Sequence, residues 1–246
     1  GDRLGIFDSV TDDEISALLR GVKPKTCSLD PIPTSLVKEL RDQFSPVFSR
    51  LTNASISSGV VPTSEKRAII TPLLKKSGLN REQLCNYRPV SGLSFLSKLI
   101  ERVVARRVNT YLYSNSLLSP YQSAYRPCHS TETALCKFYN DLASAMNSGQ
   151  VSCVVLLDLS AAFDTVDHSI LLDRLEHRFG FTGTVLNWFG SYLTNRTQAV
   201  CIDGHISHFV PLDCGVPQGS VLGPILFSMY TSPLNDIISS YNLNHQ

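Results

Sequence analysis

Asp158 is the residue best placed for chemistry, because it directly follows an apolar run, Val151–Leu157. A short apolar run bounded by turn residues predicts a buried strand. A carboxylate at the end of such a strand reaches solvent from a rigid backbone, which suits a metal ligand. An isolated Asp in this position more often does no more than end a strand. Its neighbours decide whether Asp158 is a metal ligand or only the end of a strand. They include Phe163, an aromatic residue that follows within the same segment.

Spacing excludes other catalytic chemistries. A phosphatase with an aspartyl nucleophile requires a second acid two residues after Asp158, where the sequence has Ser160. Gly219-Ser220 does not fit the G-x-S-x-G pattern of serine hydrolases, and no phosphate-binding G-x-x-x-x-G-K-[ST] loop occurs. The six histidines lack metal-ligand spacing, so we expect them to be surface or core residues.

Charge is divided unevenly along a chain whose formal net charge is only +1. Residues 1–150 hold 19 Lys and Arg against 13 Asp and Glu, whereas residues 151–246 hold 3 against 8. Residues 66–107 alone hold ten basic and two acidic side chains. This segment is either a polyphosphate-binding surface or a set of basic residues that solvate the outer face of a helix.

The composition excludes several classes of protein. A chain of 246 residues with 43% hydrophobic and 17% charged residues predicts one large globular domain or two lobes, not a disordered segment. No apolar stretch is long enough to span a membrane, and no secretory signal precedes the first helix. Seven cysteines without disulfide or zinc spacing predict reduced, intracellular thiols.

The elements that must position Asp158 are a mixture of helices and hairpins. Thr11 is a predicted helix cap, and Ser94–Tyr113 carries the clearest helical stripe of apolar residues. This mixture predicts an α+β fold. We expect further helices at about residues 34–41 and onward to 57, 130–146, 169–179, 185–193 and 221–238, the last interrupted by two prolines, and hairpins at 62–90 and 197–212.

Four segments in a fixed order resemble the reverse transcriptase domain of non-LTR (LINE-type) retrotransposons. The resemblance covers nearly the whole chain, and the ordered set is far more specific than any one motif. The segments are Ser28-Leu-Asp-Pro-Ile-Pro33, Asn86-Tyr-Arg-Pro-Val-Ser91, Leu157-Asp-Leu-Ser-Ala-Ala-Phe-Asp-Thr-Val166 and Gly215-Val-Pro-Gln-Gly-Ser-Val-Leu-Gly-Pro224, with Gln122-Ser-Ala-Tyr-Arg126 and Ser130-Thr-Glu-Thr-Ala-Leu135 between them.

The resemblance implies a right-hand polymerase that uses two Mg²⁺ ions to transfer a nucleotidyl group. Asp158 matches the first metal carboxylate of the family, and the Leu159 carbonyl matches a further ligand of the second metal. Phe163 matches the ring that excludes a ribose 2′-hydroxyl, with simple core packing as the alternative. Asp164 and Asp167 more often fix the turn and cap the next helix than bind metal.

The same resemblance implies how the substrates are held. Gln218 and Gly219 match the loop that contacts the incoming nucleotide and the template, and Ser220 is expected to cap the following helix. Arg88, with Lys75 or Lys76, matches the groups that hold the triphosphate, where a planar guanidinium and a point charge are suitable. The implied partners are template RNA, primer DNA and a dNTP.

The resemblance also implies fingers and palm regions with an incomplete palm sheet. Residues 1–60 would be an N-terminal helical extension, 61–150 the fingers with the first palm helices, and 151–246 a truncated palm with an inserted fingers hairpin. The sequence ends about where the family has an aromatic-x-Asp-Asp turn, and Asp12-Asp13 is its one Asp-Asp pair. We therefore expect an RNA-directed DNA polymerase domain, intracellular in cytoplasm and nucleus, that is inactive as this chain alone. The alternatives are a catalytically inactive nucleic-acid-binding fragment and a decayed remnant.

Overall fold

Polar side chains cap the helices at the positions that the sequence indicates. In the computed structural model, which describes residues 3–23, 26–159 and 161–243, Thr11 Oγ1 accepts a hydrogen bond from Glu14 N at the start of α1 (Asp12–Arg20). Ser130 and Thr133 form a reciprocal capping box at the start of α5 (Thr131–Asn147). Asp167 caps α6 (His168–His177) by accepting a bond from Ile170 N. The predicted caps are confirmed.

The remaining helices also follow the predicted pattern. Two longer predicted helices are interrupted, one at Leu40 and one at Ser232 just before Pro233, and each forms two shorter helices. None of the described helices is long and apolar enough to cross a membrane. Their bounds are Thr34–Glu39 (α2), Arg41–Ser58 (α3), Phe95–Ser114 (α4), Gly183–Leu193 (α7), Gly223–Thr231 (α8) and Pro233–Ser240 (α9), with short 3-10 turns at Thr63–Lys66 and Leu84–Asn86.

One small mixed sheet joins the two predicted hairpins. Strands β1 (Arg67–Leu74) and β2 (Tyr87–Gly92) pair antiparallel, and β3 (Arg196–Ile202) pairs with β4 (His205–Ile206) and β5 (Val210–Leu212). The sequence did not predict that β1 also pairs in parallel with β3, from Arg67 opposite Thr197 to Ile70 opposite Val200. The strand order β2-β1-β3-β4 leaves β2 at an edge. The predicted mixture of helices and strands is confirmed.

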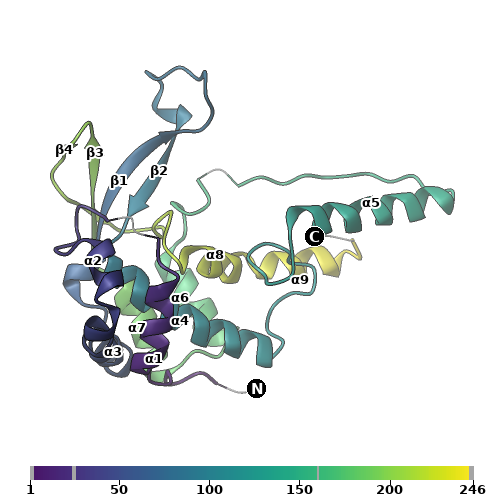
Figure 1. The fold of residues 1–246 in the computed structure, drawn as a ribbon. Coiled ribbons are helices and arrows are strands. Elements are labelled where there is room, and N and C mark those ends of the chain that lie inside the picture. Colours follow the sequence, from purple (N-terminus) through teal and green to yellow (C-terminus); the bar gives the residue numbers. More distant parts are fainter. Residues whose placement is uncertain (1–2, 24–25, 160, 244–246) are drawn as a thin grey trace.

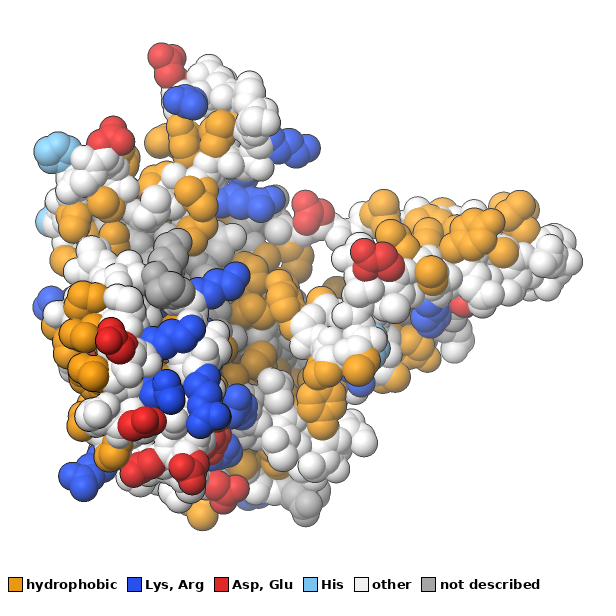
Figure 2. Space-filling view, in the orientation of Figure 1, with side chains coloured by type: hydrophobic (Ala, Val, Ile, Leu, Met, Phe, Trp, Pro, Cys, Tyr) orange, Lys and Arg blue, Asp and Glu red, His pale blue; other side chains and the backbone are white. Residues whose placement is uncertain are grey.

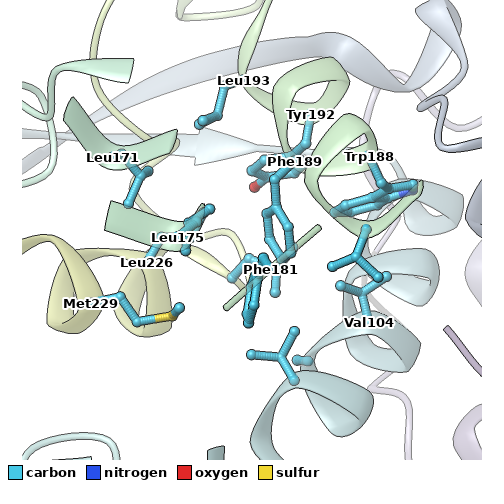
Figure 3. Packing of buried hydrophobic residues seen from close by; sticks show 14 of the residues in the cluster. Val104, Leu171, Leu175, Phe181, Trp188, Phe189, Tyr192, Leu193, Leu226 and Met229 are labelled. Carbon is cyan, nitrogen blue, oxygen red and sulfur yellow. The ribbon is translucent and has the colours of Figure 1, made fainter. Parts of the chain in front are cut away.

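Aromatic side chains of α7 and its neighbours form the main core. Trp188 and Phe189 are fully buried, and the Phe189 ring stacks on Phe181 with 5.4 Å between centroids. Figure 3 shows the rings of Phe181 and Phe189 between Val104 of α4 and Met229 of α8. Phe7, in the segment before α1, joins the same cluster. A smaller cluster packs α1 against Leu99 and Val103 of α4.

The predicted buried strand at Val151–Leu157 is wrong. Residues 151–159 form no strand and are exposed along their whole length, with Val151 at 100% and Leu156 at 88%. A strand requires a neighbour for its backbone N–H and C=O groups, and a single isolated strand buries too little apolar surface to be stable. Among the described residues no strand lies beside this segment, so its apolar sequence alone does not order it.

Helix α5 extends away from the rest of the molecule together with residues 148–159 (Figure 1). Its helical sequence was predicted correctly, yet no residue of α5 is buried. Leu135, Tyr139 and Met146 are among its exposed apolar side chains. We call residues 119–159 the arm, and the helices, sheet and other residues packed around the two core clusters the body.

Candidate functional site

The loop Gly215–Ser220 is held against two segments that are distant in the sequence. On one side, Gly215 N donates to Val166 O and Val216 N donates to Phe163 O, both at 2.8 Å. On the other side, Ser91 N of β2 donates to Gln218 O at 2.8 Å. The loop therefore bridges the Phe163 turn and the free edge of the sheet.

Two glycines permit this close approach. Gly215 has a φ of +83°, and a Cβ atom there would lie 2.8 Å from Phe163 O. Gly219 has a φ of +114°, and its Cβ would lie 3.1 Å from Ser91 O and 3.8 Å from Val90 Cγ1. Both positions thus require the left-handed conformation and the absence of a side chain. Gln218 and Gly219 meet the sheet at the strand that carries Arg88.

Phe163 lies half-buried at the base of this loop. Its ring is 5.2 Å from the Phe227 ring of α8, with a tilt of 44° between the planes. It also packs beside the main core. The ring packs against Phe227, so core packing is part of its role, and the exclusion of a ribose 2′-hydroxyl stays a prediction.

The hairpin β1–β2 presents the basic residues named by the sequence. Arg88, Lys75 and Lys76 are all exposed, and Lys75 N donates to Asn86 O at 2.8 Å where the hairpin opens into its loop. Side chains on one strand alternate between faces, so Arg88 and Val90 share a face. Gly219 approaches Val90 on that same face. Figure 2 shows Lys and Arg side chains (blue) along the hairpin and the body below it.

Asp158 and Leu159 are placed differently from the expectation. Both lie in the exposed segment of the arm, not at the end of a buried strand. No group of three or more His, Cys, Asp or Glu side chains among the described residues could hold a metal ion. One carboxylate neither neutralises nor orients two hydrated Mg²⁺ ions. The described residues therefore do not by themselves fit a two-metal site, and we assign no chemical step to one.

Asp167 has the structural role predicted for it, whereas the role of the Asp164 carboxylate stays a prediction. Asp164 N donates to Ala161 O at 2.8 Å and closes the turn that carries Phe163. The Asp167 carboxylate accepts from Ser169 Oγ and from Ile170 N, and these bonds lower the pKa of Asp167. Ser220 is not the N-cap of α8, which is Leu222, but its Oγ accepts a hydrogen bond from Gly223 N, the first residue of the helix, at 2.9 Å.

The basic segment 66–107 is less available than its charge count suggests. Lys66 is buried, with Nζ donating to Ser191 Oγ, and burial lowers the pKa of Lys66. Arg107 makes two hydrogen bonds to the Glu14 carboxylate, at 2.9 and 2.7 Å, and so joins α4 to α1. On the hairpin, Lys75, Lys76 and Arg88 stay exposed, so these charges remain available for the phosphate-binding hypothesis.

Sequence reasoning missed a buried polar group beneath the loop. Glu101 of α4 and Arg196 of β3 are each 1% exposed, and Tyr192 of α7 lies beside them. Burial raises the pKa of Glu101, although the positive charge of Arg196 opposes this effect. Burial and the nearby Glu101 also raise the pKa of Tyr192. An acidic residue inside an apolar helical stripe was the one available indication of this group.

Comparison with known proteins agrees with the motifs. Residues 74–245 match the family described as reverse transcriptase (RNA-dependent DNA polymerase). The chain is 30% identical over 229 residues, 93% of its length, to the RNA-directed DNA polymerase from mobile element jockey of Drosophila melanogaster, of which the match covers 25%. It is 30% identical over 210 residues, 85% of its length, to the probable RNA-directed DNA polymerase from transposon BS of the same species, of which 23% is covered.

A more distant relative gives the same result. The chain is 26% identical over 223 residues, 90% of its length, to the retrovirus-related Pol polyprotein from type-1 retrotransposable element R2 of Popillia japonica, of which 30% is covered. The chain thus spans about a quarter of the length of the first curated relatives that it matches. The ordered motifs, the family match and these relatives together show that the chain belongs to the reverse transcriptase family, on the branch of the non-LTR retrotransposons.

Proposed function

We propose that this chain is the nucleotide- and template-binding part of an RNA-directed DNA polymerase that serves retrotransposition. In this proposal residues 61–150 form the fingers with the first palm helices, residues 151–246 contribute to the palm, and residues 1–60 are a helical extension. Template RNA, primer DNA and dNTPs are its partners, inside the cell in cytoplasm and nucleus. The seven unpaired cysteines are consistent with that location.

The docking of the Gln218–Gly219 loop on the edge of β2 carries this proposal. It brings a backbone with no side chain at Gly219 close to the face of the hairpin that bears Arg88. Arg88 can form paired hydrogen bonds with phosphate oxygens, and a lysine can add a compact positive charge. We favour Lys75 over Lys76 for this role, because Lys75 N donates to Asn86 O, two residues before Arg88 in the sequence.

Salt titration tests the proposed template-primer contacts. Each phosphate contact on a duplex releases condensed counterions, so Arg81→Gln, in the exposed loop of the hairpin, should weaken binding of an RNA template annealed to a DNA primer and reduce the salt slope by about 0.9. Arg178→Gln is a matched control, because Arg178 lies outside the hairpin and pairs with Asp236. An affinity that does not change with salt, or equal slopes in both variants, would contradict the proposal.

Phe163 is proposed as the residue that excludes ribonucleotides. A smaller side chain should leave room for a ribose 2′-hydroxyl, so Phe163→Val should narrow the difference in affinity between a dNTP and the matching ribonucleotide. Phe227→Leu is the control, because it alters the packing partner of the same ring in α8. Equal discrimination by wild type and Phe163→Val would assign Phe163 to packing alone.

A catalytically inactive nucleic-acid-binding fragment is the second candidate function. The exposed and irregular segment around Asp158 favours it, since nothing described there fixes the carboxylate on a rigid backbone. On this hypothesis residues 1–246 bind template-primer and dNTP without extending the primer. Mg²⁺-dependent, template-directed extension by the purified chain, abolished by Asp158→Ala, would exclude it.

A further inference from the structure

Glu101 is a buried carboxylate that holds the far end of the Gly215–Ser220 loop. It lies in the middle of α4 and is 1% exposed. Its Oε2 accepts hydrogen bonds from Val221 N at 2.7 Å and Leu222 N at 3.1 Å, and its Oε1 accepts from Ser97 Oγ at 3.4 Å. The first of these bonds joins residues 120 positions apart in the sequence.

Side chains from two different elements accept the hydrogen bonds at this junction. Glu101 accepts from Val221 and Leu222, and Ser220 Oγ accepts from Gly223 N at the start of α8. The first N–H groups of a helix otherwise require water or a cap, and the helix dipole favours a negative group there. Because Glu101 belongs to α4, it fixes the end of the loop to the body and not only to α8.

Burial of a carboxylate is unfavourable, so its presence here needs a reason. Removing an ion from water costs several kcal/mol, and an apolar residue would fill the same space without that cost. The cost is offset by two backbone donors and by the positive charge of Arg196. A contribution to stability does not explain why a carboxylate is buried at this position, whereas a role in placing the Gly215–Ser220 loop does.

The other contacts of the loop leave Gln218 and Gly219 between fixed points. Gly215 and Val216 are bonded to the Phe163 turn, and Ser91 of β2 bonds to Gln218 O. Glu101 supplies the fixed point immediately after the loop. If it were released, the bond from Ser91 would be the one remaining hydrogen bond among the described residues that sets the position of Gln218 and Gly219 against the hairpin.

We propose that Glu101 is a positioning residue, which holds the Gln218–Gly219 loop in the conformation that contacts nucleotide and template. This inference rests on the proposed function for the role of the loop. A loop already ordered before binding loses less conformational entropy when the nucleotide binds. Loss of Glu101 should therefore weaken nucleotide binding more than template-primer binding, which depends on the charges of the hairpin.

Three substitutions separate the acceptor from the charge. Glu101→Gln keeps an oxygen for Val221 N and Leu222 N and can donate its amide to Ser97 Oγ, so it should rescue the loop. Glu101→Leu removes the acceptor. Glu101→Asp keeps the charge near Arg196 but withdraws the oxygen from the two amides. Val103→Ala is the matched control, because Val103 is buried on the face of α4 that packs against α1.

The experiment uses the full chain, at a temperature below the unfolding transition of every variant. It measures amide hydrogen exchange in residues 215–222. It also measures the dissociation constants of Mg²⁺-dTTP and of an RNA/DNA template-primer. Glu101→Leu and Glu101→Asp should speed exchange and weaken dTTP binding by about tenfold, the effect expected for lost bonds to a charged group. Template-primer affinity should change by less than about twofold in these variants. Glu101→Gln and Val103→Ala should match wild type in both affinities.

Each outcome bears on one of the two proposals. Equal loss of dTTP and template-primer affinity in Glu101→Leu and Val103→Ala would assign Glu101 to stability and overturn the inference. If Glu101→Leu does not fold, Glu101→Asp gives the same comparison with the charge retained. Wild type that binds no dTTP would contradict the proposed function, while unchanged exchange in residues 215–222 of Glu101→Asp would still overturn the role of Glu101.

Discussion

Strand β1 and the segment Val151–Leu157 are both short apolar runs, but only β1 forms part of a sheet. β1 pairs with β2 on one side and with β3 on the other, and Ala68, Ile69 and Ile70 are at most 7% exposed. Val151–Leu157 has no such neighbours among the described residues and stays exposed. The difference shows that strand partners, more than apolar composition, decide whether a run of this kind becomes a strand.

Helices α4 and α5 show the complementary behaviour. Both begin with a capping serine, Ser94 or Ser130, and both form helices of similar length. α4 buries residues of both core clusters, whereas α5 buries none and presents apolar side chains to solvent, as the orange surface of the arm in Figure 2 shows. A helix forms its backbone hydrogen bonds within its own segment, so it does not require a neighbouring segment for them, whereas a strand does.

The largest expected difference between body and arm concerns side-chain truncation. Trp188→Ala removes a fully buried ring from the body and should lower the free energy of unfolding by about 4 kcal/mol. Leu156→Ala in the arm should change it by less than about 0.5 kcal/mol. Urea denaturation followed by circular dichroism measures both. A similar loss in the two variants would show that the arm packs against the body in solution.

Glycine substitutions should give the next largest effect. Gly215 and Gly149 both have positive φ, but a Cβ at Gly149 meets nothing within 4 Å, while one at Gly215 clashes with Phe163 O and Asp164. Gly149 lies in the arm, so Gly149→Ala should strain the backbone there by about 1 kcal/mol and leave global unfolding almost unchanged. Gly215→Ala should cost about 3 kcal/mol, because the clash adds to the strain. Thermal unfolding of the two variants side by side checks this, and equal shifts would refute it.

Removal of helix caps should separate global from local stability. Asp167→Ala should lower the global free energy of unfolding by about 1 kcal/mol, since α6 packs into the main core. Ser130→Ala should leave global unfolding unchanged and should instead speed amide exchange in the first turns of α5. A global loss on Ser130→Ala of the same size as on Asp167→Ala would mean that α5 and the body unfold as one unit.

The smallest effect is a pH dependence confined to the body. Hydrogen bonds and charge from Arg107 hold the pKa of Glu14 below its ordinary value of 4.5. The stabilisation is therefore complete above pH 4.5 and is lost as the pH falls through the lower folded-state pKa. Glu14→Gln should lower the free energy of unfolding by up to about 1 kcal/mol at pH 7 and should reduce its dependence on pH below pH 4.5.

The matched ion pair of the arm should lack this effect. Lys137 and Asp141 pair within α5, at i and i+4, and both side chains are partly exposed. Asp141→Asn should leave the global unfolding profile unchanged from pH 3 to pH 7, since the pair does not join α5 to another element. Denaturant unfolding across that range compares the two variants. An equal pH effect in both would contradict the division between body and arm.

Local sequence determined the helices, their caps, the β1–β2 hairpin and the family. Thr11, Ser130 and Asp167 act on N–H groups three residues away, and the hairpin joins strands that are close along the chain. Such interactions depend on residue types at short spacing, which a sequence displays directly. The ordered motifs likewise identified a reverse transcriptase without any knowledge of contacts.

Tertiary structure alone decided which of these elements meet. The parallel pairing of β1 with β3, the docking of Gln218 on Ser91, and the two amides held by Glu101 all join residues far apart in the sequence. Their formation depends on the packed positions of α4 and α7, and a sequence pattern does not show how close such distant residues lie in space. For the same reason an apolar run before Asp158 predicted a strand that has no partner: hydrophobicity indicates a preference for burial, whereas a neighbouring backbone supplies the hydrogen bonds that make a strand.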